Sequence, residues 1–147
     1  MKTELNHQYS KTEEKLNIIT HAFGLLLSII AFPLLLIKSF DYEDFSKSFS
    51  LLIYGFSLIV LYAASTFYHA ANEPTLRRKL NILDHAAIYV LIAGSYTPFT
   101  IIVLEGTLGW LILGLTWSFA VTGIVMTLFF TGRFDKLSTV LYVLMGW

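Results

Sequence analysis

The stretch from Phe49 to His69, FSLLIYGFSLIVLYAASTFYH, has 21 residues and contains no Asp, Glu, Lys or Arg. A helix of about 20 mostly apolar residues is long enough to cross the hydrocarbon core of a bilayer, which is about 30 Å thick. Comparable apolar stretches cover residues 17–37, 83–104 and 108–130. The sequence therefore predicts an all-α, polytopic transmembrane helical bundle that forms a single domain with four complete spans.

The composition agrees with this fold class. Hydrophobic residues make up 56% of the chain and charged residues 14%, and almost all the charges fall between the apolar stretches. A soluble all-α protein would have to bury four such stretches within 147 residues, which is too few to enclose them. The net charge is zero, and no basic patch indicates nucleic-acid binding. The chain has no cysteine, so His, Asp and Glu are the remaining candidates for metal ligands.

A fifth apolar stretch covers residues 137–147. Its 11 residues are too few to cross a bilayer. We expect it to be the first part of a helix that continues in a longer protein. The alternative is a short re-entrant segment packed against other helices.

The Lys and Arg residues between the stretches predict the orientation, because positive residues are retained on the cytoplasmic side. Eight of the ten lie on one side: Lys2, Lys11, Lys15, Arg77, Arg78, Lys79, Arg133 and Lys136. Lys38 and Lys47 lie on the other side, near the acidic residues 41–44 and Glu105. We therefore expect an integral protein of the plasma membrane whose N-terminal arm, residues 1–16, is cytoplasmic.

Three polar residues stand at the ends of the second and third stretches: Ser65, His69 and Asp84. An ionisable group inside a membrane span costs about 2.5 to 3.5 kcal/mol on insertion scales, so its presence indicates a function. Ser65 and His69 are four residues apart and share one helix face. Residues 70–83 have the character of a short basic loop, which would make the two spans antiparallel neighbours. His69 and Asp84 would then meet near the cytoplasmic leaflet, with Ser65 in the same hydrogen-bond network.

Each of these residues also has a simpler interpretation. His69 could mark the membrane surface, and Asp84 could be the N-cap of the third helix. Ser65 could bond to its own backbone. The placement of all three at one depth on adjacent helices favours a site. His85 points about 100° away from Asp84 on a helix and is left out of it.

The first span carries a polar stripe of Glu14, Asn17, His21, Gly24 and Ser28. Gaps of three and four residues put these side chains on one helix face, which must look into the bundle or into water. We interpret the stripe as a surface for interhelical hydrogen bonds, with Gly24 permitting close approach, in preference to metal binding by His21.

Two further features concern packing. Pro98 interrupts the third span, and it predicts a kink at which the Ser95 and Thr97 hydroxyls bond to freed carbonyls. In the fourth span, small residues recur every fourth position and predict a helix-packing ridge. The ridge consists of Gly114, Ser118 and Thr122.

Three motifs carry a resemblance to a known family. They are Glu14-x-x-Asn17-x-x-Thr20-His21-x-x-Gly24, then Ser65-Thr-Phe-Tyr-His69, then Asp84-His85-x-x-Ile88-Tyr89 leading to Ala93-Gly-Ser-Tyr-Thr-Pro-Phe99. This order of motifs resembles the bacterial haemolysin III family, which is related to the progestin and adipoQ receptors and to alkaline ceramidases.

The resemblance implies a seven-helix membrane protein with a cytoplasmic N-terminus and a zinc ion near the cytoplasmic leaflet. It makes His69 a zinc ligand and places Asp84 and Ser65 in the surrounding network of water and hydrogen bonds. The family's other two ligands form a His-x-x-x-His pair in the last helix, whereas no histidine follows His85 in this chain. Two further histidine ligands are therefore expected beyond Trp147.

Three histidine ligands leave a fourth position on zinc for a water, whose pKa falls to about 7, and Asp84 could accept its proton. The resemblance thus implies hydrolysis of an amide in a lipid-like substrate that enters from the bilayer. Two other functions stay open. One is membrane lysis by a haemolysin, and the other is a receptor or stress-response regulator built on the same bundle.

Overall fold

The computed structural model describes residues 10–104, 106–130 and 135–146, and for residue 130 and residues 135–138 it describes the backbone alone. The secondary structure of the described residues is entirely helical, with short connections between the helices and no strand. The helices are α1 (Lys11–Ser39), α2 (Phe45–Ala70), α3 (Pro74–Pro98), the π-helical segment η1 (Phe99–Leu104), α4 (Gly106–Phe130) and α5 (Asp135–Gly146). The all-α prediction is confirmed.

Local sequence explains where the first helices begin. At the start of α1, Ser10 and Glu13 form a capping box, in which each side chain accepts a hydrogen bond from the backbone N–H of the other residue. At the start of α2, the Asp44 carboxylate accepts from the N–H of Ser46 at 2.8 Å. These side chains satisfy N–H groups that have no partner within the helix.

The connection between α2 and α3 differs from the prediction. Residues 70–83 are not a loop, because α3 already begins at Pro74. Proline is favoured at the first helical position, and the Glu73 carboxylate accepts from the N–H groups of Thr75 and Leu76. Asp84 consequently lies within α3, and its interpretation as an N-cap is wrong.

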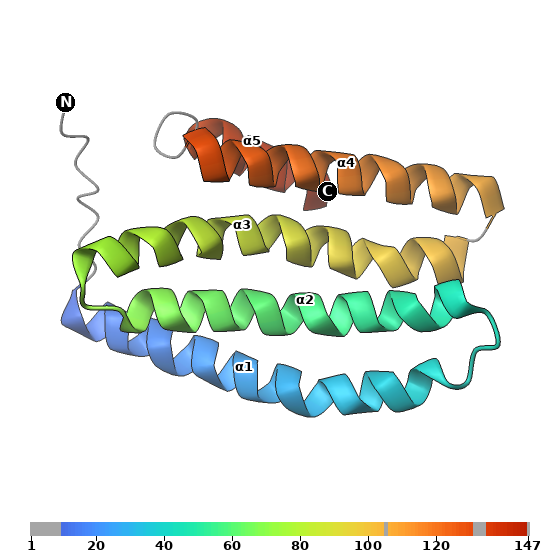
Figure 1. Ribbon diagram of the computed structural model, residues 1–147, viewed down its shortest axis with the longest axis horizontal. Coiled ribbons are helices and arrows are strands. Elements are labelled where there is room, and N and C mark those ends of the chain that lie inside the picture. Colours follow the sequence, from blue (N-terminus) through green and yellow to red (C-terminus); the bar gives the residue numbers. More distant parts are fainter. Residues whose placement is uncertain (1–9, 105, 131–134, 147) are drawn as a thin grey trace.

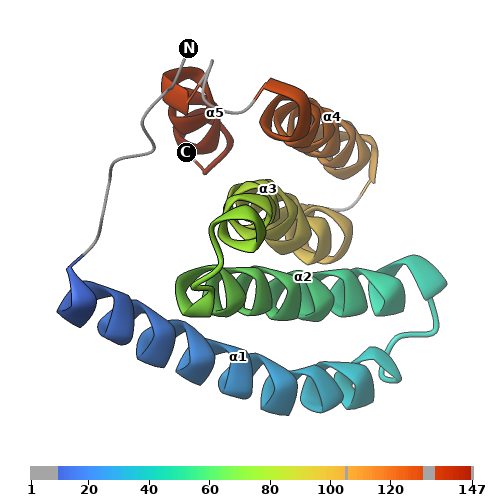
Figure 2. The same cartoon turned by 60° about the vertical axis from the view of Figure 1, so that its left-hand side comes forward.

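Each helix packs mainly against its neighbours in the sequence. In Figure 1 the chain runs back and forth, and Figure 2 shows α1 and α5 at opposite ends of the arrangement. Within the described residues α1 contacts α2, α2 contacts α3, α3 contacts α4, and α5 contacts both α3 and α4. The buried cluster between the last three helices comprises Tyr89, Ala93, Ala120 and Met145.

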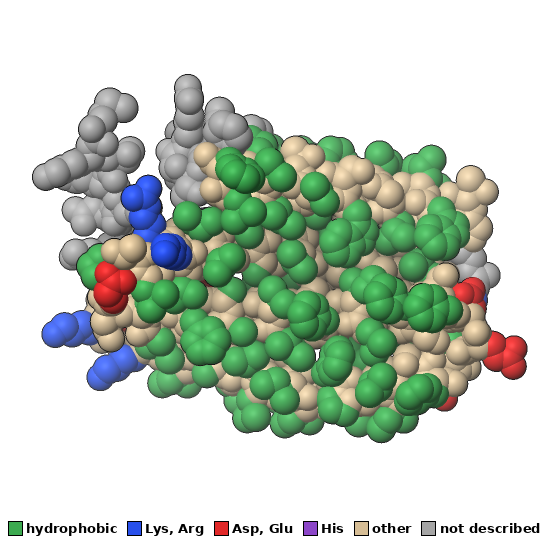
Figure 3. All heavy atoms as spheres, viewed as in Figure 1, with side chains coloured by type: hydrophobic (Ala, Val, Ile, Leu, Met, Phe, Trp, Pro, Cys, Tyr) green, Lys and Arg blue, Asp and Glu red, His purple; other side chains and the backbone are tan. Residues whose placement is uncertain are grey.

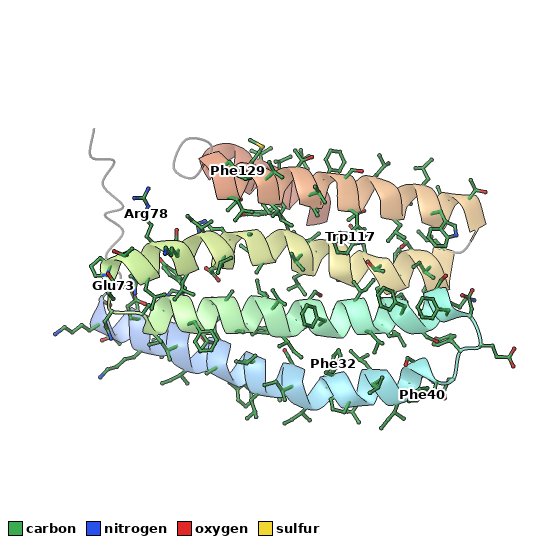
Figure 4. All side chains as sticks on the ribbon, viewed as in Figure 1. Phe32, Phe40, Glu73, Arg78, Trp117 and Phe129 are labelled. Carbon is green, nitrogen blue, oxygen red and sulfur yellow. The ribbon has the colours of Figure 1, made fainter. Side chains whose placement is uncertain are left out.

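The Pro98 region departs from regular helix, as the proline predicts. The chain passes from α3 into the π-helical turns of η1 directly after Pro98. The hydroxyls of Ser95 and Thr97 donate to the carbonyls of Ile92 and Ala93 at 2.8 and 2.7 Å. Trp117 of α4 donates its indole N–H to the Thr97 hydroxyl at 3.0 Å, which ties the two helices together (Figure 4).

The ridge predicted on α4 does not pack against a described helix. Gly114, Ser118 and Thr122 are exposed. The hydroxyls of Ser118 and Thr122 donate to the carbonyls of Gly114 and Ser118, one turn back in the same helix, at 2.7 and 2.8 Å. The prediction that this ridge is a contact surface is therefore wrong for the helices described here.

The outer surface is that of a membrane protein. Four helical segments are long and apolar enough to cross a bilayer: Lys11–Ser39, Phe45–Ala70, Pro74–Leu104 and Gly106–Phe129. Figure 3 shows apolar side chains over the middle of the molecule and charged side chains at its two ends. Large apolar residues such as Leu34, Phe56 and Phe129 are more than half exposed, as lipid contact requires. The protein is an integral membrane protein.

Candidate functional site

The centre of the candidate site is a hydrogen bond between His69, near the end of α2, and Glu14, in the first turn of α1. Nδ1 of His69 lies 2.8 Å from Oε2 of Glu14. The His69 side chain is only 7% exposed and that of Glu14 is 20% exposed. Since an ionised carboxylate only accepts hydrogen bonds, Nδ1 carries the proton and donates it to Glu14. The other ring nitrogen, Nε2, is then the atom that would hold a metal.

His21 lies beside His69, two turns beyond Glu14 on the inner face of α1. The two imidazole rings are stacked with their centroids 5.6 Å apart. The His21 ring also lies 6.2 Å from the ring of Tyr62. Its buried Nδ1 atom has no hydrogen-bond partner among the described residues. An unpaired buried polar atom is rare and calls for an explanation such as an ion or a water.

The polar stripe on α1 faces α2, as we expected. A Cβ atom on Gly24 would lie 2.6 Å from Cδ1 of Tyr62, so the glycine permits the close approach of the two helices. Ser28 is buried and donates to the carbonyl of Gly24 at 2.8 Å. This part of the stripe serves helix packing, while Glu14 and His21 belong to the cluster around His69.

Arg77 completes this cluster from α3. Its Nη2 atom forms an ion pair with Oε1 of Glu14, so the two oxygens of one carboxylate bind Arg77 and His69. Its Nη1 atom donates to the carbonyls of Tyr68 and Ala71 at 3.5 and 3.2 Å. The guanidinium also stands over the Tyr68 ring, 4.8 Å from the centroid, in a cation–π contact.

Ser65 and Asp84 lie at the same end of the molecule. Ser65 is buried on α2, four residues before His69. Asp84 is half-buried on α3. His85 is exposed, and its carbonyl accepts a 3.3 Å hydrogen bond from Tyr142.

Two adjoining cavities lie at the opposite end of the molecule. Their volumes are about 250 and 210 Å³, and both are lined by Ser46, Ile101 and Trp110. Neither has a residue of the His69 cluster in its wall. The cluster is thus a packed polar contact between three helices and not the lining of either cavity.

Comparison with known proteins identifies the family. The sequence profile of the family described as "Haemolysin-III related" matches residues 9–147. The chain belongs to the haemolysin III family.

Two bacterial relatives of this haemolysin III-family chain are similar over most of its length. It is 44% identical to Hemolysin-3 of Bacillus cereus and 47% identical to the Hemolysin-3 homolog of Bacillus subtilis, over 92% of this chain in each case. It is 26% identical to the human monocyte to macrophage differentiation factor over 96% of its length. The chain spans 61 to 63% of the length of these curated relatives. No solved structure matches it.

The residues of the haemolysin III cluster fit part of a metal site. A histidine ligand commonly donates its second ring N–H to a carboxylate, as His69 does to Glu14. The unpartnered Nδ1 of His21 is a second potential donor atom nearby. Within the described ranges, no group of three or more His, Asp or Glu side chains is placed to hold a metal ion. Further ligands would have to come from other parts of the protein.

The sequence alone did not reveal how Glu14, Arg77 and Tyr68 meet. Glu14 was recognised as part of a stripe, and Arg77 only as a positive residue that sets orientation. One signal in the sequence could have pointed to the pair. Glu14 and Arg77 are charged residues just before the first and third apolar stretches, and these stretches flank the one that ends at His69. Nothing in their spacing says that one arginine reaches a carboxylate 63 residues away.

Proposed function

We propose that this haemolysin III-family protein is a zinc-dependent membrane hydrolase acting on amide-linked, lipid-like substrates. The observation that carries the proposal is the bond between Glu14 and Nδ1 of His69, buried at one end of a membrane bundle. A metal-ligating histidine usually donates its second ring N–H to a carboxylate, a backbone carbonyl or a water, and the His69–Glu14 bond has this form. Zinc is the metal that the family resemblance implies.

The roles of the chain's residues follow from their positions. His69 would hold the metal through Nε2, and Glu14 would fix the tautomer and orientation of the ring. Zinc, when bound, supplies a Lewis acid and lowers the pKa of a bound water to about 7. Asp84 would accept the proton of the attacking water, and Ser65 would orient the same hydrogen-bond network. The proposal also requires two histidine ligands beyond the described residues.

The proposal includes an orientation. The start of α1 and the α2–α3 connection lie at the same end of the molecule (Figure 1), with Lys11, Lys15 and residues 77–79 close by. Lys38 and Lys47 are near the other end. Of the remaining basic residues, Lys2 and Arg133 lie outside the described residues, as does the Lys136 side chain. We place the His69 end on the cytoplasmic side of the plasma membrane.

Lipid analysis of a gene-deletion strain tests the proposed reaction. Amide-linked lipids should accumulate in the deletion strain and released fatty acid should fall. Expression of the wild-type gene should restore both, whereas the His69→Ala variant should restore neither. Unchanged amide-linked lipid in the deletion strain would contradict the proposal.

The names of the two Bacillus relatives favour membrane lysis as a second candidate. It predicts that purified protein releases haemoglobin from red cells. If lysis occurs and survives the His69→Ala substitution, the lytic function is independent of the candidate metal site.

A further inference from the structure

Arg77 connects two helices whose backbones are separated by α2. Within the described residues, no Cα atom of α1 lies within 8 Å of a Cα atom of α3. The Arg77 side chain nevertheless reaches from α3 to the carboxylate of Glu14 on α1. This contact spans α2, the helix that carries His69.

The guanidinium is held at three points besides Glu14. Nη1 donates to the carbonyls of Tyr68 and Ala71, at the C-terminal end of α2. Carbonyls at a helix C-terminus lack partners within the helix, and a positive charge is favourable there. The Tyr68 ring covers the guanidinium plane. The planar, forked guanidinium allows one arm to cap α2 while the other binds the carboxylate, which the single ammonium of a lysine cannot do.

Arg77 therefore determines where the Glu14 carboxylate lies. With Oε1 bound to Arg77, Oε2 is directed at Nδ1 of His69. Without Arg77, the Glu14 carboxylate, which is only 20% exposed, would keep His69 as its one side-chain partner among the described residues. A carboxylate in such a place turns toward water, and this movement removes the acceptor from Nδ1.

We infer that Arg77 is a positioning residue for His69, acting through Glu14. Arg77 fixes the Glu14 carboxylate, and the carboxylate keeps His69 protonated at Nδ1 so that Nε2 can bind metal. The inference rests on the proposed function for the identity of the metal. It does not depend on which bond, if any, the protein hydrolyses.

Arg78 is a matched control for Arg77. It is the next residue on α3, and it is exposed and directed away from α1 and α2 (Figure 4). It carries the same charge at the same end of the bundle, so loss of charge alone affects both variants equally. Only Arg77 contacts Glu14 and the end of α2.

The test measures zinc affinity by chelator competition and the visible spectrum of the cobalt(II)-substituted protein, using the full-length gene product in detergent. Replacement of a residue that orients a metal ligand typically lowers metal affinity about 10- to 100-fold. We expect a loss of that size in Arg77→Gln and in Glu14→Gln, with altered cobalt bands, and no more than a twofold change in Arg78→Gln. The Arg77→Gln, Glu14→Gln double variant should lose no more zinc affinity than whichever single variant binds zinc less tightly. Both substitutions act through His69, so their effects should not add.

Arg77→Lys is the second variant, needed in case Arg77→Gln does not fold. It keeps the positive charge but cannot cap α2 and bind Glu14 together, so it should fold and still lose affinity. Wild-type zinc affinity and cobalt spectrum in Arg77→Lys or Arg77→Gln would overturn the inference, as would an equal loss in Arg78→Gln. Failure of the zinc-loaded protein to hydrolyse amide-linked lipids would overturn the proposed function alone.

Discussion

The proposed roles of His69 and Asp84 can be distinguished by the effect of each substitution on zinc content. The proposal makes His69 a direct ligand, whereas Asp84 acts on the attacking water. In the full-length gene product, His69→Ala should lose most of its zinc together with hydrolysis. Asp84→Asn should lose hydrolysis and keep most of its zinc. Elemental analysis of the purified variants measures this difference. Full zinc content in His69→Ala would refute the ligand assignment.

Glu73 gives a prediction of pH dependence. The N–H groups of Thr75 and Leu76 donate to its carboxylate and lower the pKa of Glu73. A lowered pKa in the folded state means that the stabilisation is complete above the unfolded-state value of about 4.3. It is lost as the pH falls through the folded-state value.

Glu73→Ala should therefore lower the melting temperature at pH 7, and its difference from the wild type should shrink below about pH 4. Thermal unfolding in detergent across this pH range provides the measurement. Glu43→Ala, which removes an exposed carboxylate near the opposite end, is the control and should change little. A Glu73→Ala difference that stays constant with pH would show that the charge of the cap is not responsible.

Sequence could single out polar residues at the His69 end of the molecule but not the contacts that hold His69. Ser65, His69 and Asp84 are conspicuous because polar groups are costly in apolar stretches. Glu14 and His21 share a helix face with regular spacing, so their direction was also predictable. Arg77 lies among other basic residues, and only the packing of three helices shows that it binds Glu14 and Arg78 does not.

At the scale of the element, hydrophobicity in the sequence predicts the four spanning helices but not all of their boundaries. A hydrophobic stretch marks the part of a helix inside the bilayer, and a helix can extend beyond it. The first turns of α3 carry Arg77, Arg78 and Lys79 and have no apolar signal, yet Glu73 and Pro74 start the helix there. An acidic N-cap followed by proline is a signal for the start of a helix, and both residues are visible in the sequence. A prediction of helix boundaries from hydrophobicity alone does not use this signal.

Helix contact predicts different effects for two glycines. A Cβ atom on Gly94 of α3 would lie 2.7 Å from Cβ of Ser57 on α2, whereas one on Gly114 of α4 would have no neighbour within 4 Å. In the 147-residue chain, Gly94→Ala should lower the melting temperature because α2 and α3 must move apart. Gly114→Ala should keep or raise it, because alanine favours a helix more than glycine does. Equal melting temperatures for both variants in detergent would contradict this close approach.

At the scale of the whole molecule, the orientation can be tested directly because the chain has no cysteine of its own. Asn72→Cys places a thiol at the exposed α2–α3 connection, and Glu43→Cys places one at the α1–α2 connection. In intact cells, an impermeant thiol reagent should label the cysteine at position 43 and not the one at position 72. The reverse pattern would place the His69 end outside the cell.

The packing of each helix against its neighbours in the chain has a consequence for how the protein is made. As the chain is synthesised, α2 can dock on α1, and α3 on α2, before the later helices have left the ribosome. Docking between consecutive helices closes only short loops, and such local contacts favour rapid folding. The Glu14, His69 and Arg77 cluster would then close as soon as the start of α3 enters the membrane, ahead of α4 and α5. If the insertion machinery releases the helices in order, α1, α2 and the start of α3 would already be packed together when they enter the bilayer.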